Sequence, residues 1–447
     1  MENSVAAKQN RKIKAIPRTG ARYKFFLLVI FINIVIPKCG IKIAGIPITL
    51  GTVLYAILLL KLLPELLKIK FNGYAKVFAI AVLYFILRSV LSLCLGWGFS
   101  DFVTYISCLA IYPFIGILVP FIVKTKEQIL GVQKIITVGV IIIVVYAFLQ
   151  FIFGIEKVCI PGITVNFSDY KEWGAQWYLQ KYNGYGDGAK IVSTYQNGNV
   201  FGVSLIVLSS FSYAYLRKEK SFRIQILFLM LVSIVCLLTL SRTVWFGLAI
   251  MLFVVYIKTP AKTHNGVIAK VLLLLIGFVT VVVVCYISEN LYYRIASLFS
   301  IEVFQLGGRT PIVIDFINSV KDNPLFYPVS VIGVQSIVEY SSLMFEISYI
   351  TVFTLYGILG VVLFLFMLLY PIKVIRRCGG RIFDYFPIVV FCFMALLDGC
   401  MWLPPTSFNL FLIIGLLMQN VKVKSALSFE DKKRRVILAG GSEDLTP

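Results

Sequence analysis

Charged residues are scarce in this sequence, and histidine is almost missing. Asp, Glu, Lys and Arg make up only 14% of the 447 residues, and the chain has one histidine, His264. Soluble domains carry about 25% charged residues, so this composition excludes an ordinary soluble protein. The nine cysteines show no metal-type spacing. We therefore expect neither a metal site nor a disulfide framework.

Long apolar runs take the place of the missing charges. Hydrophobic residues make up 59% of the chain. The runs recur along the whole length, and all but the first, eighth and twelfth, which are short, can cross a hydrocarbon core of about 30 Å as a helix. The sequence therefore predicts an all-α, polytopic integral membrane protein with about twelve transmembrane helices. These spans are expected near residues 24–37, 43–63, 74–96, 102–123, 129–154, 192–216, 222–239, 243–258, 268–288, 346–372, 383–400 and 407–421.

Acidic residues are half as frequent as basic ones. The chain has 21 Asp and Glu against 42 Lys and Arg, which gives a net charge of +21. In a soluble protein this excess would indicate a nucleic-acid partner. Here about three-quarters of the basic residues fall in segments that share one side of the membrane, if the N-terminus is cytoplasmic. The excess is therefore the positive-inside signal, which indicates that both termini are cytoplasmic and implies no nucleic acid.

The chain divides into a membrane domain and two tails. We expect a cytoplasmic N-terminal tail at 1–23, a transmembrane helical domain at 24–421 and a cytoplasmic tail at 422–447. The first apolar run is not followed by a small-residue cleavage site. We therefore expect it to be retained as the first span.

Two long loops lie on the predicted outer side, at 155–191 and 289–345. Loops beyond about 12–15 residues are usually functional or disordered, and the aromatic and β-branched residues of these two argue against disorder. Trp173 and Trp177 lie in the first loop among polar residues. Their rings could stack on sugar rings, or they could form an aromatic belt at the membrane interface; the sequence leaves both readings open.

The second loop contains a predicted amphipathic helix. The stretch GGRTPIVIDFINSVKDNP places Pro311 in the first turn, apolar residues at helical spacing after it, and Asn323–Pro324 at its end. Proline is common at the first position of a helix, as at Pro311, and a proline after a helix ends it, as at Pro324. Arg309 is expected at the N-terminal end of this helix, either solvated or facing a substrate.

Polar residues also mark the outer ends of two spans. In STYQNGNVFG, Asn197 and Asn199 precede the apolar run of 192–216 and could cap the helix or form part of a site. In TLSRTVWFG, Arg242 lies between two apolar runs. It could snorkel to the interface or bind an anion.

Charged residues in or beside apolar runs complete the candidate site. Glu346 enters the span of 346–372, with Tyr349 close behind it. Arg88 and Asp398 lie inside apolar runs, where a charge is costly unless it pairs or faces water, so we expect them to pair or to line a cavity. Two arginines facing one cavity suit a pyrophosphate leaving group, and a carboxylate could accept a sugar hydroxyl proton. Together they would allow glycosyl transfer without a metal.

The order of these elements resembles the O-antigen polymerase and ligase superfamily, which includes Wzy-type polymerases of capsule and exopolysaccharide. STYQNGNVFG is similar to the family's Gly-Thr-Phe-x-Asn-Pro-Asn-x-Phe-Gly element, with Gly198 in place of proline. SRTVWFG resembles Ser-Arg-x-x-Trp/Phe-x-Gly, and GGRTP with the later NPLF resembles Gly-Arg-x-x-x-Trp followed by a turn. The resemblance covers roughly residues 190 to 372, and the N-terminal spans carry no motif.

One element departs from the family pattern. Ligases carry His-Asn-x-Tyr-Leu where this chain has Glu346-Ile347-Ser348-Tyr349-Ile350. An acidic residue at this place is more like the polymerases, so the departure argues against a ligase. YPVSVIG also stands where the family has a glycine-rich turn.

The resemblance implies a polysaccharide polymerase in a bacterial cell membrane. Such an enzyme joins undecaprenyl-pyrophosphate-linked oligosaccharide repeat units on the outer face, needs no cofactor, and assembles with a chain-length regulator protein. An O-antigen-type ligase and a lipid-linked oligosaccharide flippase or transporter remain the alternatives. We take as catalytic candidates Arg242, Arg309 and Glu346, and as substrate-binding candidates Asn197, Asn199, Arg88, Trp173, Trp177 and Tyr349.

Overall fold

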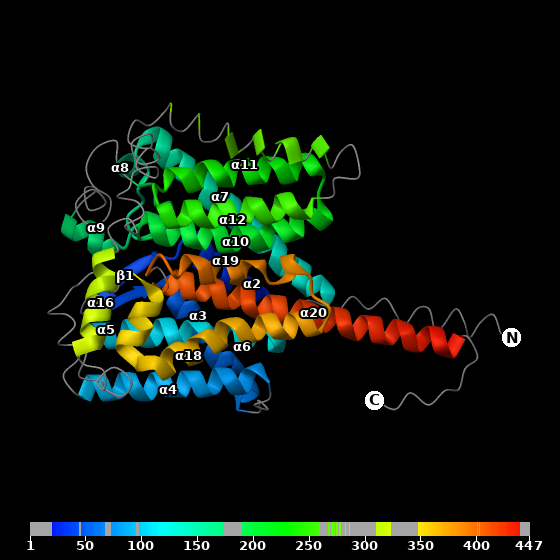
Figure 1. Cartoon of the computed structure of the whole chain (residues 1–447), viewed down its shortest axis with the longest axis horizontal. Coiled ribbons are helices and arrows are strands. Elements are labelled where there is room, and N and C mark those ends of the chain that lie inside the picture. Colours follow the sequence, from blue (N-terminus) through cyan, green and yellow to red (C-terminus); the bar gives the residue numbers. More distant parts are fainter. Residues whose placement is uncertain are drawn as a thin grey trace.

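The computed structural model is mostly helical (Figure 1). It describes residues 20–43, 46–67, 73–94, 98–173, 190–259, 310–322, 347–399 and 403–438, with residue 401 and scattered positions between 267 and 286. Within this part, six helical stretches are long and apolar enough to cross a membrane. The prediction of a helical membrane protein is therefore confirmed.

The six stretches are spread along the chain between Tyr74 and Ala426. They are α4 (Tyr74–Cys94), the stretch Phe102–Ile122, α7 (Lys126–Phe153), α10 (Gly198–Glu219), α18 (Ser348–Arg377) and the first part of α20 (Pro404–Leu438). The stretch Phe102–Ile122 is made of α5 (Phe99–Ile106), η1 (Ser107–Ile111), η2 (Tyr112–Phe114) and α6 (Ile115–Ile122). Shorter helices are α2 (Ala21–Val35), α3 (Leu50–Leu66), α11 (Phe222–Leu238) and α12 (Arg242–Lys258).

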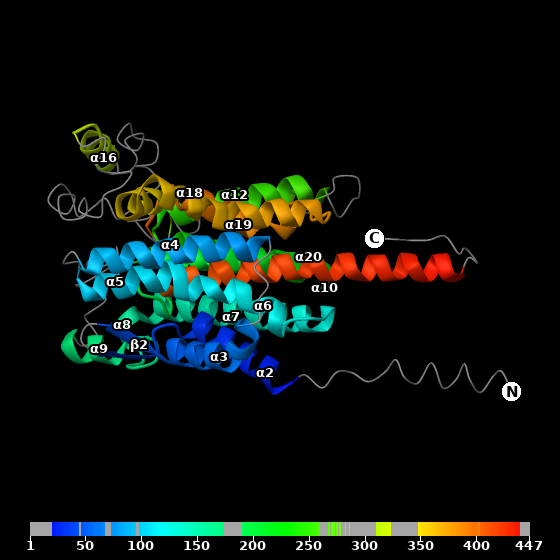
Figure 2. The ribbon, with the colours of Figure 1, turned by 90° about the horizontal axis from the view of Figure 1, so that it is seen from below.

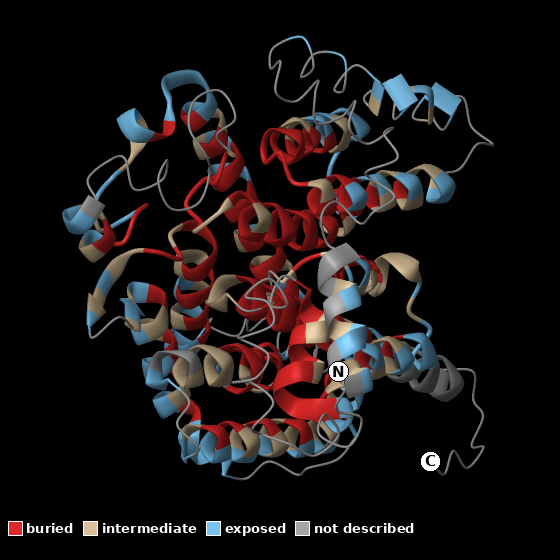
Figure 3. Ribbon diagram, turned by 60° about the vertical axis from the view of Figure 1, so that its left-hand side comes forward, coloured by how far each residue is buried: buried red, intermediate tan, exposed pale blue. Residues whose placement is uncertain are grey.

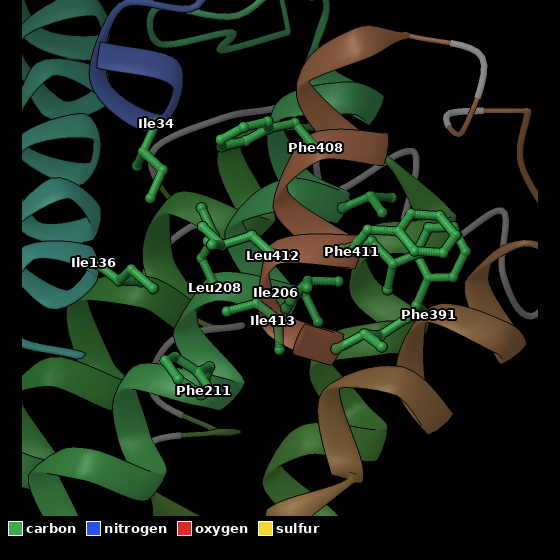
Figure 4. Close-up of a cluster of buried hydrophobic side chains, with 14 of the residues drawn as sticks. Ile34, Ile136, Ile206, Leu208, Phe211, Phe391, Phe408, Phe411, Leu412 and Ile413 are labelled. Carbon is green, nitrogen blue, oxygen red and sulfur yellow. The ribbon is translucent and has the colours of Figure 1, made fainter. Parts of the chain in front are cut away.

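The core of the bundle lies between α10 and α20, which run side by side (Figures 1 and 2). Burial is concentrated there, and the surrounding helices turn apolar side chains outward (Figure 3). Such an exposed apolar exterior suits contact with lipid. The close-up in Figure 4 shows Ile206, Leu208 and Phe211 of α10 facing Phe408, Phe411, Leu412 and Ile413 of α20, with Ile34, Ile136 and Phe391 beside them.

The span expected at 43–63 is shorter than predicted, because its first residues form a β-hairpin. Strands β1 (Gly40–Ile43) and β2 (Ile46–Thr49) pair antiparallel, with Gly40 opposite Thr49. Alternating β-branched residues favour a strand. Gly40 has φ +154°, and a Cβ there would lie 2.2 Å from the Ile48 carbonyl oxygen, so only glycine fits. The Thr49 hydroxyl then accepts a hydrogen bond from Thr52 N and caps α3.

The span expected at 383–400 also differs. The short helix α19 (Phe386–Met394) follows the 3-10 turn η9 (Ile382–Asp384), and the described residues from Ala395 to Leu403 are not α-helical. Nine residues of α-helix rise about 13 Å, which is too short for a bilayer. The residues at the C-terminal end of this expected span place Asp398 beside the first turns of α10 and α18. The span expected at 268–288 lies mostly outside the described residues.

Most of the irregular structure lies at one end of the bundle. The hairpin, α8 (Ile155–Val158), α9 (Phe167–Trp173) and α16 (Thr310–Asp322) gather there, and α20 extends from the opposite end (Figures 1 and 2). We call the end of the bundle at which the hairpin, α8, α9 and α16 gather the loop end. Gly40 N donates to the Gly162 carbonyl at 3.1 Å, which joins the hairpin to the segment before α9.

Helix α16 confirms the amphipathic helix predicted after Arg309. Its apolar residues Val313, Phe316 and Val320 pack against Ile347 and its neighbours at the start of α18. The Phe316 and Phe353 rings meet edge to face with centroids 5.2 Å apart. This contact holds α16 against the first turns of α18.

Candidate active site at the loop end

The polar stretch before α10 is held in place by one glutamine. Gln150 Nε2 donates to the Ser193 carbonyl at 2.8 Å, and Ser193 N donates to Gln150 Oε1 at 2.7 Å. The Ser193 hydroxyl donates to the Ile143 carbonyl. Ser193 has φ +51°, a left-handed conformation that a serine adopts only where its surroundings stabilise it. The hydrogen bonds of Ser193 and Gln150 thus hold the segment before α10 in one conformation.

The two asparagines of the motif have different partners. Asn197 Oδ1 accepts a hydrogen bond from Val200 N at 2.9 Å and caps α10. Asn199, in the first turn, donates from Nδ2 to Asp398 Oδ2 at 2.8 Å. Its Oδ1 is buried and has no hydrogen-bond partner among the described residues. Asn197 therefore shapes the helix, and Asn199 reaches across the bundle.

Asp398 connects the starts of two helices. It is only 5% exposed. Besides binding Asn199 through its carboxylate, it accepts two hydrogen bonds at its carbonyl oxygen, from Ser348 Oγ at 2.7 Å and from Ser348 N at 3.2 Å. Ser348 is the first residue of α18. The N-terminal ends of α10 and α18 are thus joined through one buried aspartate.

The start of α12 adjoins the same segment. Thr243 donates from its hydroxyl to the Leu397 carbonyl at 3.4 Å. Arg242, the residue before it, is the first residue of α12 and is partly exposed. The N-terminal ends of three helices therefore surround residues 397 and 398, and a helix N-terminus favours a negative charge nearby. We call Asn199, Arg242, Ser348 and Asp398 the helix-start cluster.

Three other predicted site residues lie apart from the helix-start cluster. Tyr349 donates from its hydroxyl to the Cys392 carbonyl at 3.1 Å, within the contact of α18 with α19. Arg88 lies on α4, where its neighbour Ser89 shares a hydrogen bond with the Tyr356 hydroxyl of α18. Trp173 is the last residue of α9. Within the described residues, these hydrogen bonds do not join Tyr349 or Arg88 to Asn199, Arg242 or Asp398.

Arg309, Glu346 and Trp177 lie outside the described residues. Thr310 is the first residue of α16, and Ile347 directly precedes α18. Ile347 is the buried centre of the α16–α18 contact.

A cavity of about 240 Å³ lies beside α10, bordered by Gln196 and Val200. The described residues of its lining include the charged side chains Lys38, Lys42 and Asp169, which were not singled out by the sequence analysis. A signal existed: KCGIKI carries two lysines in a segment on the predicted outer side, where basic residues are few. The pairing of Lys42 with Asp169, far apart in the chain, left no trace in the sequence.

Within the described part of the chain, no group of three or more His, Cys, Asp or Glu side chains lies close enough together to hold a metal ion. The helix-start cluster offers an arginine, amide and hydroxyl donors, and a buried carboxylate, which can bind anionic and hydroxylated groups. Comparison of the chain with protein-family models, with curated proteins and with solved structures finds no match.

Proposed function

We propose that this protein is a multi-pass polysaccharide polymerase of a bacterial cell membrane, with about twelve spans and both termini in the cytoplasm. It joins undecaprenyl-pyrophosphate-linked oligosaccharide repeat units on the outer face. The observation that carries the proposal is the helix-start cluster. Asn199 of one motif bonds to the buried Asp398, and Thr243 of the Arg242 motif bonds to the carbonyl of its neighbour Leu397. Two separate motifs of the resemblance thereby come together in space.

The reaction is a glycosyl transfer that needs no metal. A hydroxyl oxygen at the non-reducing end of the acceptor repeat attacks the anomeric carbon of the donor chain. The bond from that carbon to the pyrophosphate oxygen breaks, and the pyrophosphate leaves on its lipid with the bonding electrons. Arg242 and Arg309 stabilise the charge on the pyrophosphate, and Glu346 accepts the hydroxyl proton.

Asp398 and Asn199 act as positioning residues in this proposal. Asp398 holds Ser348, two residues after Glu346, through two hydrogen bonds. The contact from Thr243 to Leu397 holds the start of α12, where Arg242 lies. A loss of either contact would displace a proposed catalytic residue, and small displacements of catalytic groups reduce rates strongly.

The proposal is tested by the chain length of the surface polysaccharide. A strain lacking this gene is complemented with the wild-type gene or with Arg242→Ala, Arg309→Ala or Glu346→Gln, and each protein is quantified in the membrane. We expect long chains with wild type and only single lipid-linked repeats with the variants. Lys424→Gln, in the second half of α20, is the matched control and is expected to restore long chains.

The alternatives give different products. A flippase predicts lipid-linked repeats trapped on the inner face of the membrane. A ligase predicts long chains that stay on the lipid carrier and fail to reach their final acceptor. Normal polymer in all three variants, at normal protein levels, would refute the proposed site.

Co-purification from native membranes tests the chain-length regulator as a partner.

A further inference from the structure

A pocket of about 420 Å³ lies where α10 finishes, at the end of the bundle opposite the loop end (Figure 1). Ligand pockets have volumes of about 300–1,000 Å³, so this one is large enough for a small molecule or a lipid headgroup. It is open beside Gly379, where a Cβ would meet nothing within 4 Å. The described residues of its lining include four basic side chains, a carboxylate and an aromatic ring, which are Arg217, Lys218, Arg381, Lys424, Asp384 and Phe383.

Three candidate membrane spans end at this pocket. The span in α10 ends at Glu219, the span in α18 at Arg377 and the span in α20 at Ala426. Lys218 and Lys424 lie within two residues of two of these ends. The pocket is therefore at the depth of the lipid headgroups, where lysine and arginine side chains meet phosphate groups.

The Asp384 carboxylate is engaged through both of its oxygens. Oδ2 accepts a hydrogen bond from Arg381 N at 2.9 Å, and Oδ1 lies 3.5 Å from Lys424 Nζ. The Asp384 side chain is only 16% exposed. These contacts fix the carboxylate in the pocket wall, and they make Lys424 its counter-ion.

Lys218 has like charges as close neighbours. Its ammonium lies near enough to Lys424 and Arg217 to be repelled by both, whereas Asp384 attracts it. Lys218 is exposed, so a ligand in the pocket can reach it. An anion between Lys218 and Arg217 would turn the repulsion between them into attraction to a shared partner.

The Phe383 ring holds Arg217 at the pocket. The guanidinium carbon lies 4.6 Å from the ring centroid, which is a cation–π contact. One guanidinium nitrogen also donates to the Lys258 carbonyl at 3.5 Å. A guanidinium has five N–H donors in a rigid fork, so Arg217 keeps donors for the oxygens of a phosphate.

We propose that this pocket binds a phosphate group, held by Arg217, Lys218 and Arg381 through charge-assisted hydrogen bonds. An anionic phospholipid and free phosphate share this group, and the position at the ends of three spans favours the phospholipid. Lys424 stays paired with Asp384. The site is independent of the proposed polymerase activity, because it lies at the other end of the bundle from the helix-start cluster.

The test uses the purified full-length protein in detergent. Native mass spectrometry measures the retention of phosphatidylglycerol in competition with phosphatidylcholine, in which the choline ammonium offsets the phosphate charge. In separate arms, the melting temperature is measured with inorganic phosphate and with acetate, because a ligand that binds only the folded state stabilises it. We expect phosphatidylglycerol to be retained over phosphatidylcholine, and phosphate to stabilise more than acetate.

Substitutions in the lining locate the site. Lys218→Met and Arg381→Met are each expected to weaken phosphatidylglycerol binding about fivefold, because each removes one cation at headgroup depth. Lys126→Met is the matched control. It removes an exposed cation at the start of α7, at the same end of the bundle but outside the described lining, and should leave binding unchanged.

Asp384→Asn is expected to have the opposite effect. An asparagine oxygen can still accept from Arg381 N, while the negative charge that opposes a phosphate is removed, so phosphatidylglycerol binding should tighten. Without added lipid, Lys218→Met should melt no lower than wild type, because it removes a charge that its neighbours repel. A lower melting temperature without lipid would indicate a structural role for Lys218 and count against its role as a ligand.

The arms separate the two sources of the phosphate. Stabilisation by inorganic phosphate without retention of phosphatidylglycerol would support the site and assign it to free phosphate. Equal retention of both lipids together with equal effects of phosphate and acetate would overturn the proposal. Unchanged binding in both Lys218→Met and Arg381→Met, or an equal loss in Lys126→Met, would also overturn it, because the lipid would then bind elsewhere on the basic surface.

Discussion

Asn199 and Asp398, which are 199 positions apart in the chain, are joined by a hydrogen bond of 2.8 Å from Nδ2 to Oδ2. The bond connects the first turn of α10 to the segment after α19, and the same aspartate binds Ser348 at the start of α18. A hydrogen bond to a charged acceptor is among the stronger ones in proteins. Asp398 therefore links three parts of the loop end, through its carboxylate and its backbone carbonyl.

Asp398→Ala is expected to destabilise the protein by about 1.5–3 kcal/mol, because it leaves the Asn199 amide buried without its charged acceptor. The double variant Asn199→Asp with Asp398→Asn reverses donor and acceptor and should recover part of this stability. The melting temperatures in detergent of wild type, of Asp398→Ala, of Asn199→Asp and Asp398→Asn singly, and of the double variant measure the effect. If the double variant loses as much stability as Asn199→Asp and Asp398→Asn lose together, the pair is not coupled.

Gln150→Leu should be more damaging than its small change of volume suggests. The substitution leaves both the amide and the carbonyl of Ser193 without partners in a buried position. Each such group costs about 1–3 kcal/mol. Gln150→Glu keeps the acceptor for Ser193 N and is expected to lose less. The fraction of folded, detergent-extractable protein is the measurement, and equal yields for both variants would contradict this account.

Gly202→Ala and Gly247→Ala form a matched pair on facing helices. A Cβ at position 202 would lie 2.3 Å from Val244 Cγ2, a branched side chain of α12 that cannot move away. A Cβ at 247 would lie 2.5 Å from Met394 Sδ, which belongs to a flexible side chain. We expect Gly202→Ala to lower folded protein sharply and Gly247→Ala to be mild.

Relief of the clash provides the control for this pair. Gly202→Ala combined with Val244→Ala should recover folded protein, because the second change removes the methyl groups that obstruct the new Cβ. Size-exclusion profiles of wild type and the three variants measure the recovery. A double variant as poorly folded as Gly202→Ala alone would show that the α10–α12 contact is not the cause.

Lys38 predicts how stability depends on pH. Its pKa is lowered in the folded protein, mainly by burial, with Lys42 adding to the shift and Asp169 and Cys159 opposing it. The unfolded chain therefore binds more protons between the lowered folded pKa and the usual lysine pKa, so stability rises with pH in that window. Lys38→Met should flatten this rise. Identical pH profiles of the melting temperature for wild type and Lys38→Met would contradict the assignment.

Local signals in the sequence determined the class of the protein and several of its elements. Apolar runs long enough for a bilayer predicted α4, α7, α10 and α18, because a helix is the structure that satisfies its own backbone hydrogen bonds in lipid. Pro311 in the first turn and Asn323–Pro324 beyond the end predicted α16. Residues within a few positions of each other decide each of these features.

Apolar content alone did not distinguish a span from other buried structure. The first described residues of the span expected at 43–63 belong instead to strands β1 and β2, and this hairpin bonds to the segment around α9 through Gly40 and Lys42. The span expected at 383–400 contains a nine-residue helix, and its end carries Asp398 to the helix-start cluster. In both places the chain leaves the expected helix and makes a polar contact with a distant segment, from Lys42 N to Ser168 and from Asn199 to Asp398.

The sequence by itself determined that the chain is a helical membrane protein, and it marked Asn197, Asn199 and Arg242 as residues at helix starts. Only the tertiary structure decided which helix starts adjoin one another. It separated the capping role of Asn197 from the long-range bond of Asn199, and it paired Lys42 with Asp169 in a cavity wall. The physical reason is range: caps and apolar periodicity act within one helix, whereas these pairs depend on how distant segments pack.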